Sequence, residues 1–184
     1  MEKTEALMRE YETLREEALG SMSNRAQIVS FGLATVGVLS AGVFASEVAA
    51  QEVGLILLVF NAAVPTISVV VTYMWFGEVE RMVRAGRFIA ALEGRINAQI
   101  DPSEPTLRWQ SERTGEAGRM DYPYVVVLAL FLGMAATSPL VGFLTSDLAW
   151  GGHWWALASP WALVLGASGH LALRREKFLA AGYV

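Results

Sequence analysis

The sequence predicts an all-α membrane protein with four transmembrane helices that form two hairpins. The chain of 184 residues is 54% apolar and only 17% charged, whereas soluble domains carry about 25% charge. Four stretches contain no Asp, Glu, Lys or Arg, and each exceeds the roughly 20 apolar residues that a helix needs to cross a bilayer. None alternates with the two-residue period of a barrel strand, so each is predicted to be a helix. These stretches are residues 26–46, 53–77, 122–146 and 148–173.

The basic residues predict the orientation of these helices. All 14 Lys and Arg residues lie in the N-terminal tail, in the central segment or in the C-terminal tail. The two short connections, residues 47–52 and 147–153, contain none. The positive-inside rule therefore places both termini and the central segment in the cytoplasm, and four spans require the same arrangement.

Five segments make up the predicted organisation: an amphipathic cytoplasmic helix, a transmembrane hairpin, a cytoplasmic helix with a linker, a second transmembrane hairpin and a cytoplasmic tail. Gly151 and Gly152 interrupt the last apolar stretch, so its helix is predicted to begin near Trp154. A cleavable secretory signal is the alternative for the first apolar stretch, but the residues before it are more acidic than basic, unlike a signal peptide. The five segments are residues 1–25, 26–77, 78–121, 122–173 and 174–184, in that order.

The N-terminal helix has an apolar face and an acidic character, so we expect it to pack on protein rather than on an anionic membrane. The second span continues without a break to Asp101-Pro102, which ends the helix. This predicts one helix from residue 53 to residue 100, about 70 Å long. Either the N-terminal helix or the same helix of another subunit covers its apolar stripe. The predicted cytoplasmic partner face consists of Leu7, Tyr11, Leu14, Met82, Ile89 and Ile96.

Residues 101–121 form a polar connection with few large apolar side chains, among them Leu107 and Trp109. One interpretation is a surface linker tethered by Trp109. The other is a loop that senses a ligand or a partner.

Catalytic and metal-binding motifs are missing from the sequence, and we expect no enzyme activity, cofactor or metal. The chain has no cysteine and two histidines, which removes thiolate metal sites and thiol nucleophiles. The segment Gly166-Ala167-Ser168-Gly169 resembles the nucleophile motif of rhomboid proteases, but His170 lies about 200° around the helix from Ser168 and cannot serve as its base. The net charge of −4 argues against direct binding of nucleic-acid polymers.

The predicted spans contain no ionisable residue at depth, which disfavours a proton-coupled exporter. They do contain uncharged polar residues. Asn61, Ser68 and Thr72 share one helical face near Pro65. This face predicts either the lining of a water-filled pore or hydrogen-bonding contacts between helices.

Small residues recur along the first and fourth spans at helical spacing. Such stripes allow two helix backbones to approach closely, either within the chain or between subunits. The helix-packing candidates are Ser30, Ala34, Gly37, Ala41 and Ala45 in the first span, and Ala158, Ala162 and Gly166 in the fourth.

The layout of the first 100 residues resembles the SLATT-type proteins, which are small helical membrane effectors of bacterial anti-phage systems. The resemblance rests on Tyr11-Glu12-Thr13-Leu14-Arg15-Glu16-Glu17 before the first span and on residues 75–100 after the second. It implies a homo-oligomer in the bacterial inner membrane that leaks ions when an upstream sensor protein or nucleotide signal activates it. The second hairpin departs from the two-span pattern of these proteins. A non-conducting membrane anchor or scaffold that recruits a cytoplasmic partner is the alternative function.

Overall fold

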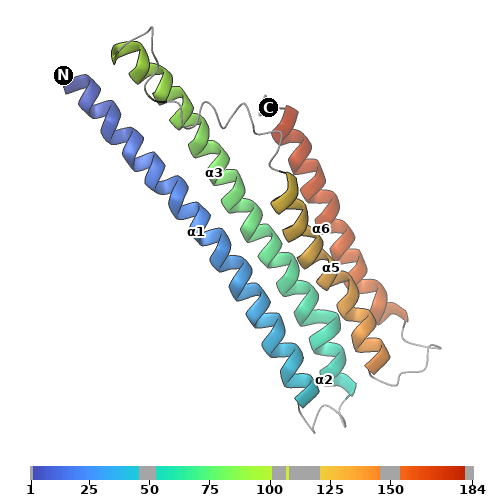
Figure 1. Cartoon of the computed structure of the whole chain (residues 1–184). Coiled ribbons are helices and arrows are strands. Elements are labelled where there is room, and N and C mark those ends of the chain that lie inside the picture. Colours follow the sequence, from blue (N-terminus) through green and yellow to red (C-terminus); the bar gives the residue numbers. More distant parts are fainter. Residues whose placement is uncertain (1, 46–52, 101–106, 108–120, 146–153, 181–184) are drawn as a thin grey trace. The chain divides into compact units, whose positions relative to one another are not determined.

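The computed structural model describes residues 2–45, 53–100, 107, 121–145 and 154–180 of the chain (Figure 1). Apart from residue 107, all of these residues are helical, which confirms the predicted all-α class for the described part of the chain. The elements are α1 (Glu2–Ala45), α2 (Val53–Leu57), the π-helical turn η1 (Leu58–Ala63), α3 (Val64–Ile100), α5 (Asp121–Thr145) and α6 (Trp154–Ala180).

Three helical stretches in the described residues are long and apolar enough to cross a membrane: Thr4–Ala45, Val53–Ile100 and Val125–Leu144. Their length and composition are those of a membrane protein. The helix α6 begins at Trp154, where the sequence predicts the start of the fourth span. The N-terminal amphipathic helix is not a separate element, because α1 runs from Glu2 to Ala45 without a break.

The chain divides into two compact units, to which α1 and α3 both contribute. The helix-pair unit contains residues 2–27 and 75–122 among those described. The bundle unit contains the described parts of residues 28–74 and 123–183. Each unit has its own buried apolar residues.

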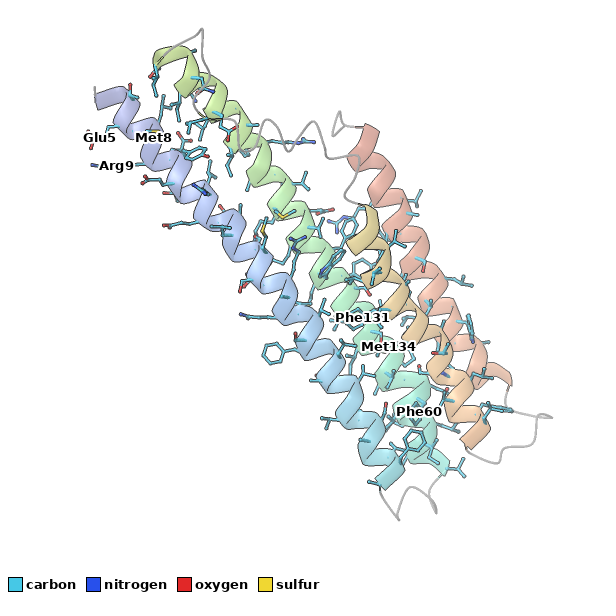
Figure 2. The ribbon with its side chains drawn as sticks, in the orientation of Figure 1. Glu5, Met8, Arg9, Phe60, Phe131 and Met134 are labelled. Atoms are coloured by element: carbon cyan, nitrogen blue, oxygen red, sulfur yellow. The ribbon has the colours of Figure 1, made fainter. Side chains whose placement is uncertain are left out.

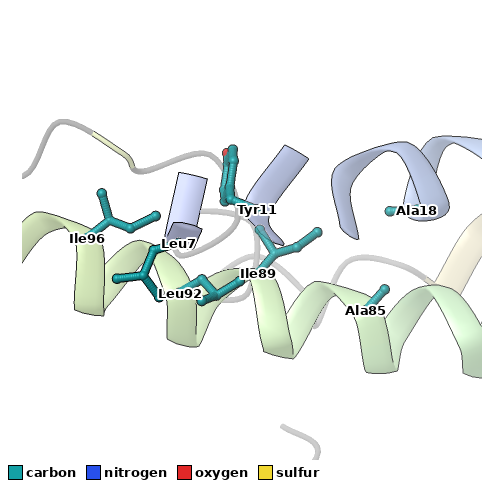
Figure 3. Close-up of a cluster of buried hydrophobic side chains, with 7 residues drawn as sticks. All are labelled: Leu7, Tyr11, Ala18, Ala85, Ile89, Leu92 and Ile96. Atoms are coloured by element: carbon teal, nitrogen blue, oxygen red, sulfur yellow. The ribbon is translucent and has the colours of Figure 1, made fainter. Parts of the chain in front are cut away.

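In the helix-pair unit, α1 and α3 run antiparallel, since Thr4 bonds to Gln99 and Tyr11 bonds to Glu93. The buried positions follow steps of three and four residues on both helices, which is the spacing of a coiled-coil seam. Figure 3 shows the two rows of side chains facing each other. The N-terminal helix thus covers the apolar stripe of α3, as one of the two sequence alternatives predicted. The cluster consists of Leu7, Tyr11, Ala18, Ala85, Ile89, Leu92 and Ile96.

In the bundle unit, the helix formed by α2, η1 and α3 packs against both α1 and α5–α6. One cluster joins it to Val36 and Val43 of α1 and to Met134 of α5, and Figure 2 labels Phe60 and Met134 of this cluster. A second cluster joins Val69 of α3 to α5 and α6. The α2–α3 helix is therefore central to this unit, since it contributes to both clusters.

Two glycines allow close packing in the bundle unit. A Cβ atom at Gly32 would lie 2.8 Å from Val71 Cγ1, and one at Gly142 would lie 2.7 Å from Phe60 Cβ. Real Cβ atoms do not approach that closely, so the backbones of α1 and α5 come nearer to the α2–α3 helix than any other residue would permit.

The π turn accommodates Pro65. A proline inside an α-helix removes one hydrogen bond, and its ring clashes with the carbonyl four residues earlier. Here the N–H of Val64 donates to the carbonyl of Val59, five residues back, which widens the helix just before the proline. The predicted continuous helix from residue 53 to residue 100 is confirmed, with this turn as an unpredicted feature inside it.

Large apolar side chains cover much of the outer surface of the bundle unit. In water such a surface would favour aggregation, whereas lipid tails solvate it, as the transmembrane assignment requires. These exposed residues come from all four helical stretches and include Phe31, Val38, Phe44, Leu58, Val70, Met74, Leu140, Leu144 and Leu165.

Candidate functional site

The predicted pore-lining residues lie inside the bundle unit. Ser68 and Thr72 are both 0% exposed. The amide oxygen and nitrogen of Asn61 are buried as well, although the residue as a whole is partly exposed. All three therefore face other helices of the same chain.

A fourth buried polar residue, Ser138 of α5, was not predicted. Its neighbours on α5 define where it lies. Gly142, one turn away, packs against Phe60 and Asn61, and Ala135, one turn in the other direction, packs in the cluster of Val69. Ser138 therefore lies between these contacts, on the face of α5 that meets the stretch between Asn61 and Val69. We name Asn61, Ser68, Thr72 and Ser138 the polar seam.

The hydrogen bonds of the polar seam are incomplete. The hydroxyl of Thr72 donates to the carbonyl of Ser68 at 2.8 Å. In contrast, Asn61 Nδ2 and Oδ1, Ser68 Oγ and Ser138 Oγ are buried and have no hydrogen-bond partner among the described residues. Buried polar groups that lack a partner each cost about 1–3 kcal/mol.

Hydroxyl groups outside the seam donate hydrogen bonds to backbone carbonyls of their own helix. Thr35 and Thr137 are exposed, and each donates to the carbonyl four residues earlier at 2.8 Å. Among the buried hydroxyls of the seam, Thr72 makes this bond as well, whereas Ser68 and Ser138 do not. Pro65 is also fully buried in this stretch and supplies no N–H of its own.

The predicted small-residue stripes lie on exposed surfaces. Packing within the chain does not account for them, since each of these residues is exposed and a Cβ at Gly37 or Gly166 would meet no atom within 4 Å. On α6 the buried positions among the described side chains are Pro160, Val164, Ala167 and Leu171 instead. The exposed stripes are Ser30, Ala34, Gly37, Ala41 and Ala45 on α1, and Ala158, Ala162 and Gly166 on α6.

The predicted cytoplasmic partner face holds the chain's own two helices together. Five of its six residues are buried in the helix-pair unit and Leu14 is partly buried. Because the chain itself covers these side chains, a partner would contact other side chains of this unit. The large apolar residues exposed there include Leu19 and Phe88. The six residues are Leu7, Tyr11, Leu14, Met82, Ile89 and Ile96.

A carboxylate lies within this apolar interface. Glu93 is 1% exposed, and the Tyr11 hydroxyl donates to its Oε1 at 3.5 Å. Burial, followed by the negative charge of Glu93, raises the pKa of Tyr11, so the phenol stays protonated and keeps its donor. The sequence pattern pointed to Ile89 and Ile96 and missed Glu93 between them, because a helical period locates a face and does not resolve which positions at its edge are buried. A buried polar pair of this kind favours one register of a helix pair.

Arg25 and Glu78 face each other in the helix-pair unit. Burial lowers the pKa of Arg25, and the charge of Glu78 opposes that shift. Glu78 Oε1 also accepts a hydrogen bond from Arg81 at 3.4 Å. These charges lie next to the apolar stretches of α1 and α3.

The linker is tethered by Leu107. The Asn97 side chain donates to the carbonyl of Leu107 at 2.8 Å and accepts from its N–H at 2.9 Å. Leu107 also packs on the apolar cluster of the helix-pair unit. Trp109, the predicted tether, lies outside the described residues.

The geometry gives Ser168 no histidine base from its own motif. The ring of His170 meets Tyr73 of α3 edge-on, with 5.7 Å between centroids. An open depression of about 520 Å³ follows α6 at Gly166, Gly169 and Arg174. In the described residues, no three His, Asp or Glu side chains gather in a way that could hold a metal ion. Comparison with protein families, curated proteins and solved structures gives no match.

Proposed function

We propose that this chain forms an oligomeric membrane pore, or a membrane-perturbing effector, which is gated from its cytoplasmic side. The polar seam carries this proposal, because Asn61, Ser68 and Ser138 hold unpaired polar atoms inside an apolar bundle. In a bilayer each such group costs several kcal/mol when it has no hydrogen-bond partner. A path for water or ions would supply the missing partners. Uncharged oxygens and amides let ions pass without binding them tightly.

The exposed stripes of small residues support assembly into an oligomer. The stripe on α1 is open along its whole length, and small residues permit the close backbone contact that drives helix association in lipid. A second copy of the chain can pack there without displacing any side chain of the first.

The layout resemblance to SLATT-type effectors supports gating from the cytoplasm and a role in anti-phage defence. In this proposal the protein lies in the bacterial inner membrane with four spans, the fourth being α6, and with both termini in the cytoplasm. The helix-pair unit is then the part that a sensor protein or a nucleotide signal reaches.

Ion flux from liposomes tests the proposed pore. We expect potassium release from vesicles that contain the purified chain, and at least a tenfold (about 1.4 kcal/mol) slower release for Asn61→Leu or Ser68→Leu, because leucine fills the seam with apolar atoms. Val70→Leu is the matched control, since Val70 lies two residues from Ser68 and is exposed. The pore is rejected if vesicles stay sealed under all conditions, including addition of candidate nucleotides.

A non-conducting scaffold is the second candidate, and exposed apolar residues of the helix-pair unit favour it. Leu19 is 50% exposed and Phe88 is 64% exposed. In a scaffold these residues bind a soluble partner. Sealed vesicles, together with partner capture that Phe88→Ser abolishes, would establish this function instead.

The proposed topology predicts that a cysteine at Gly152 is labelled only from outside the cell. The chain has no cysteine of its own, so a single introduced thiol gives an unambiguous signal. A membrane-impermeant maleimide is applied to intact cells and, separately, to inverted vesicles. A cysteine at Glu17 is the control and should show the opposite pattern. Labelling of the Gly152→Cys thiol in inverted vesicles alone would reverse the arrangement.

A further inference from the structure

We propose that water occupies the polar seam and that this wet seam runs between α3 and α5 inside a single chain. This inference deepens the proposed function, on which it rests for its biological purpose. It assigns the hydrated path to the interior of each subunit rather than to the interface between subunits, and it adds Ser138 to the residues that line the path.

The two sides of the seam, on α5 and on the α2–α3 helix, are in contact at both ends of the seam. A Cβ at Gly142 would lie 3.4 Å from Asn61 Oδ1, so this end of α5 touches the amide directly. At the other end, Ala135 and Val69 share one apolar cluster. Because Ser138 lies four residues from Gly142 and three from Ala135, it faces the stretch from Asn61 of η1 to Val69 of α3.

The seam offers several hydrogen-bonding groups and few competing partners. Asn61 provides two N–H donors and a carbonyl acceptor, and the two serine hydroxyls each donate and accept. None of these side-chain N and O atoms has a hydrogen-bond partner in the part of the chain that the structure describes. A buried water makes two to four hydrogen bonds, and these unpaired groups are available to waters along the seam.

The small side chains of α5 distinguish this seam from an apolar helix contact. The residues of α5 that face this stretch include Ala135, Ser138 and Gly142, and of these three only Ser138 carries a hydroxyl. A serine without a role in hydration would be expected to bond to its own helix, as Thr137 does next to it. Ser138 is buried without such a bond, which indicates that its hydroxyl points into the seam and is free to bond to water there.

Cysteine accessibility tests this inference without any need for conduction. Thiols react with water-soluble methanethiosulfonates as thiolates, and a thiolate forms only where water reaches it. In the cysteine-free chain we expect Ser138→Cys and Ser68→Cys to react at least about tenfold faster than matched thiols on the lipid-facing surface. The matched controls are Leu140→Cys on α5 and Val70→Cys on α3, since both positions are exposed on the outer surface of the bundle.

Each outcome decides the inference. If Ser138→Cys reacts as slowly as Leu140→Cys, the seam is dry and the inference is overturned, whether or not the chain conducts. If only Ser68→Cys reacts, α5 does not line the water and the inference also fails. Fast labelling with sealed liposomes rejects the pore and retains the wet seam. Ser138→Ala, with helicity measured by circular dichroism, checks that the native fold tolerates loss of the hydroxyl.

Discussion

Ile89→Asp separates α1 from α3 in the helix-pair unit. Ile89 is 0% exposed and lies at the centre of the cluster that joins Leu7, Tyr11 and Ala18 to α3. Losing a buried isoleucine side chain costs about 2–5 kcal/mol. Burying a carboxylate in its place costs more, because the cluster contains no cation and its one hydroxyl, on Tyr11, already donates to Glu93. Both costs fall on the one interface that joins these two helical segments, so we expect the pair to open.

Cross-linking between Ala18→Cys and Ala85→Cys measures this opening. The two alanines belong to the same buried cluster, and Figure 3 shows them on facing helices. A short thiol-specific cross-linker should join them in the parent chain and fail to join them with Ile89→Asp. Phe88→Asp is the control, because Phe88 is adjacent but largely exposed. Equal cross-linking in Ile89→Asp and in Phe88→Asp would contradict the predicted role of Ile89.

Gly142→Ala destabilises the bundle unit by about 1–3 kcal/mol, the usual cost of overpacking a tight contact. The new Cβ would lie 2.7 Å from Phe60 Cβ. Neither atom can move by side-chain rotation, because both are attached directly to the backbone. The helices must shift apart, and the contact of Gly142 with Asn61 is lost with them. Gly142→Leu is expected to cost more, since a longer side chain enters the same contact.

Loss of helicity during titration with a denaturing detergent measures this change. Gly133→Ala on the same helix is the control, because a Cβ at Gly133 meets no atom within 4 Å. Gly32→Ala tests the same principle on α1, where a Cβ meets Val71 and Phe131. The close contact would be refuted if Gly142→Ala unfolds at the same detergent fraction as Gly133→Ala.

Charge placement and helical period predicted much of the fold. The absence of charge over long stretches predicts helices because no other open structure satisfies its backbone in lipid. The steps of three and four residues from Leu7 to Ala18 predict one face, and that face packs as expected. These signals are local, since each depends on the spacing within one helix.

The rest of the site depends on which helices contact each other. The spacing of residues within one helix carries no information about that. Ser138 is one of several hydroxyls in apolar stretches, and its burial follows from the contact of Gly142 with Phe60. The small-residue stripe of α1 has the same spacing as a buried stripe, yet the chain packs α1 through Gly32, Val36 and Val43 instead. The two valines bury more apolar area than alanines do, and Gly32 lets the backbone of α1 approach Val71 closely, so this face makes the contact within the chain.

The π turn Leu58–Ala63 also sets how this helix tolerates changes in length. A π turn holds one residue more than the α-helical turn that it replaces, and one residue corresponds to about 100° of rotation. Removing a residue from this turn would restore regular winding and rotate Ile56 relative to Val64, two side chains that share one cluster. Homologous chains that lack the extra residue would therefore need a different set of apolar positions before the turn, and those that keep it would also be expected to keep Pro65.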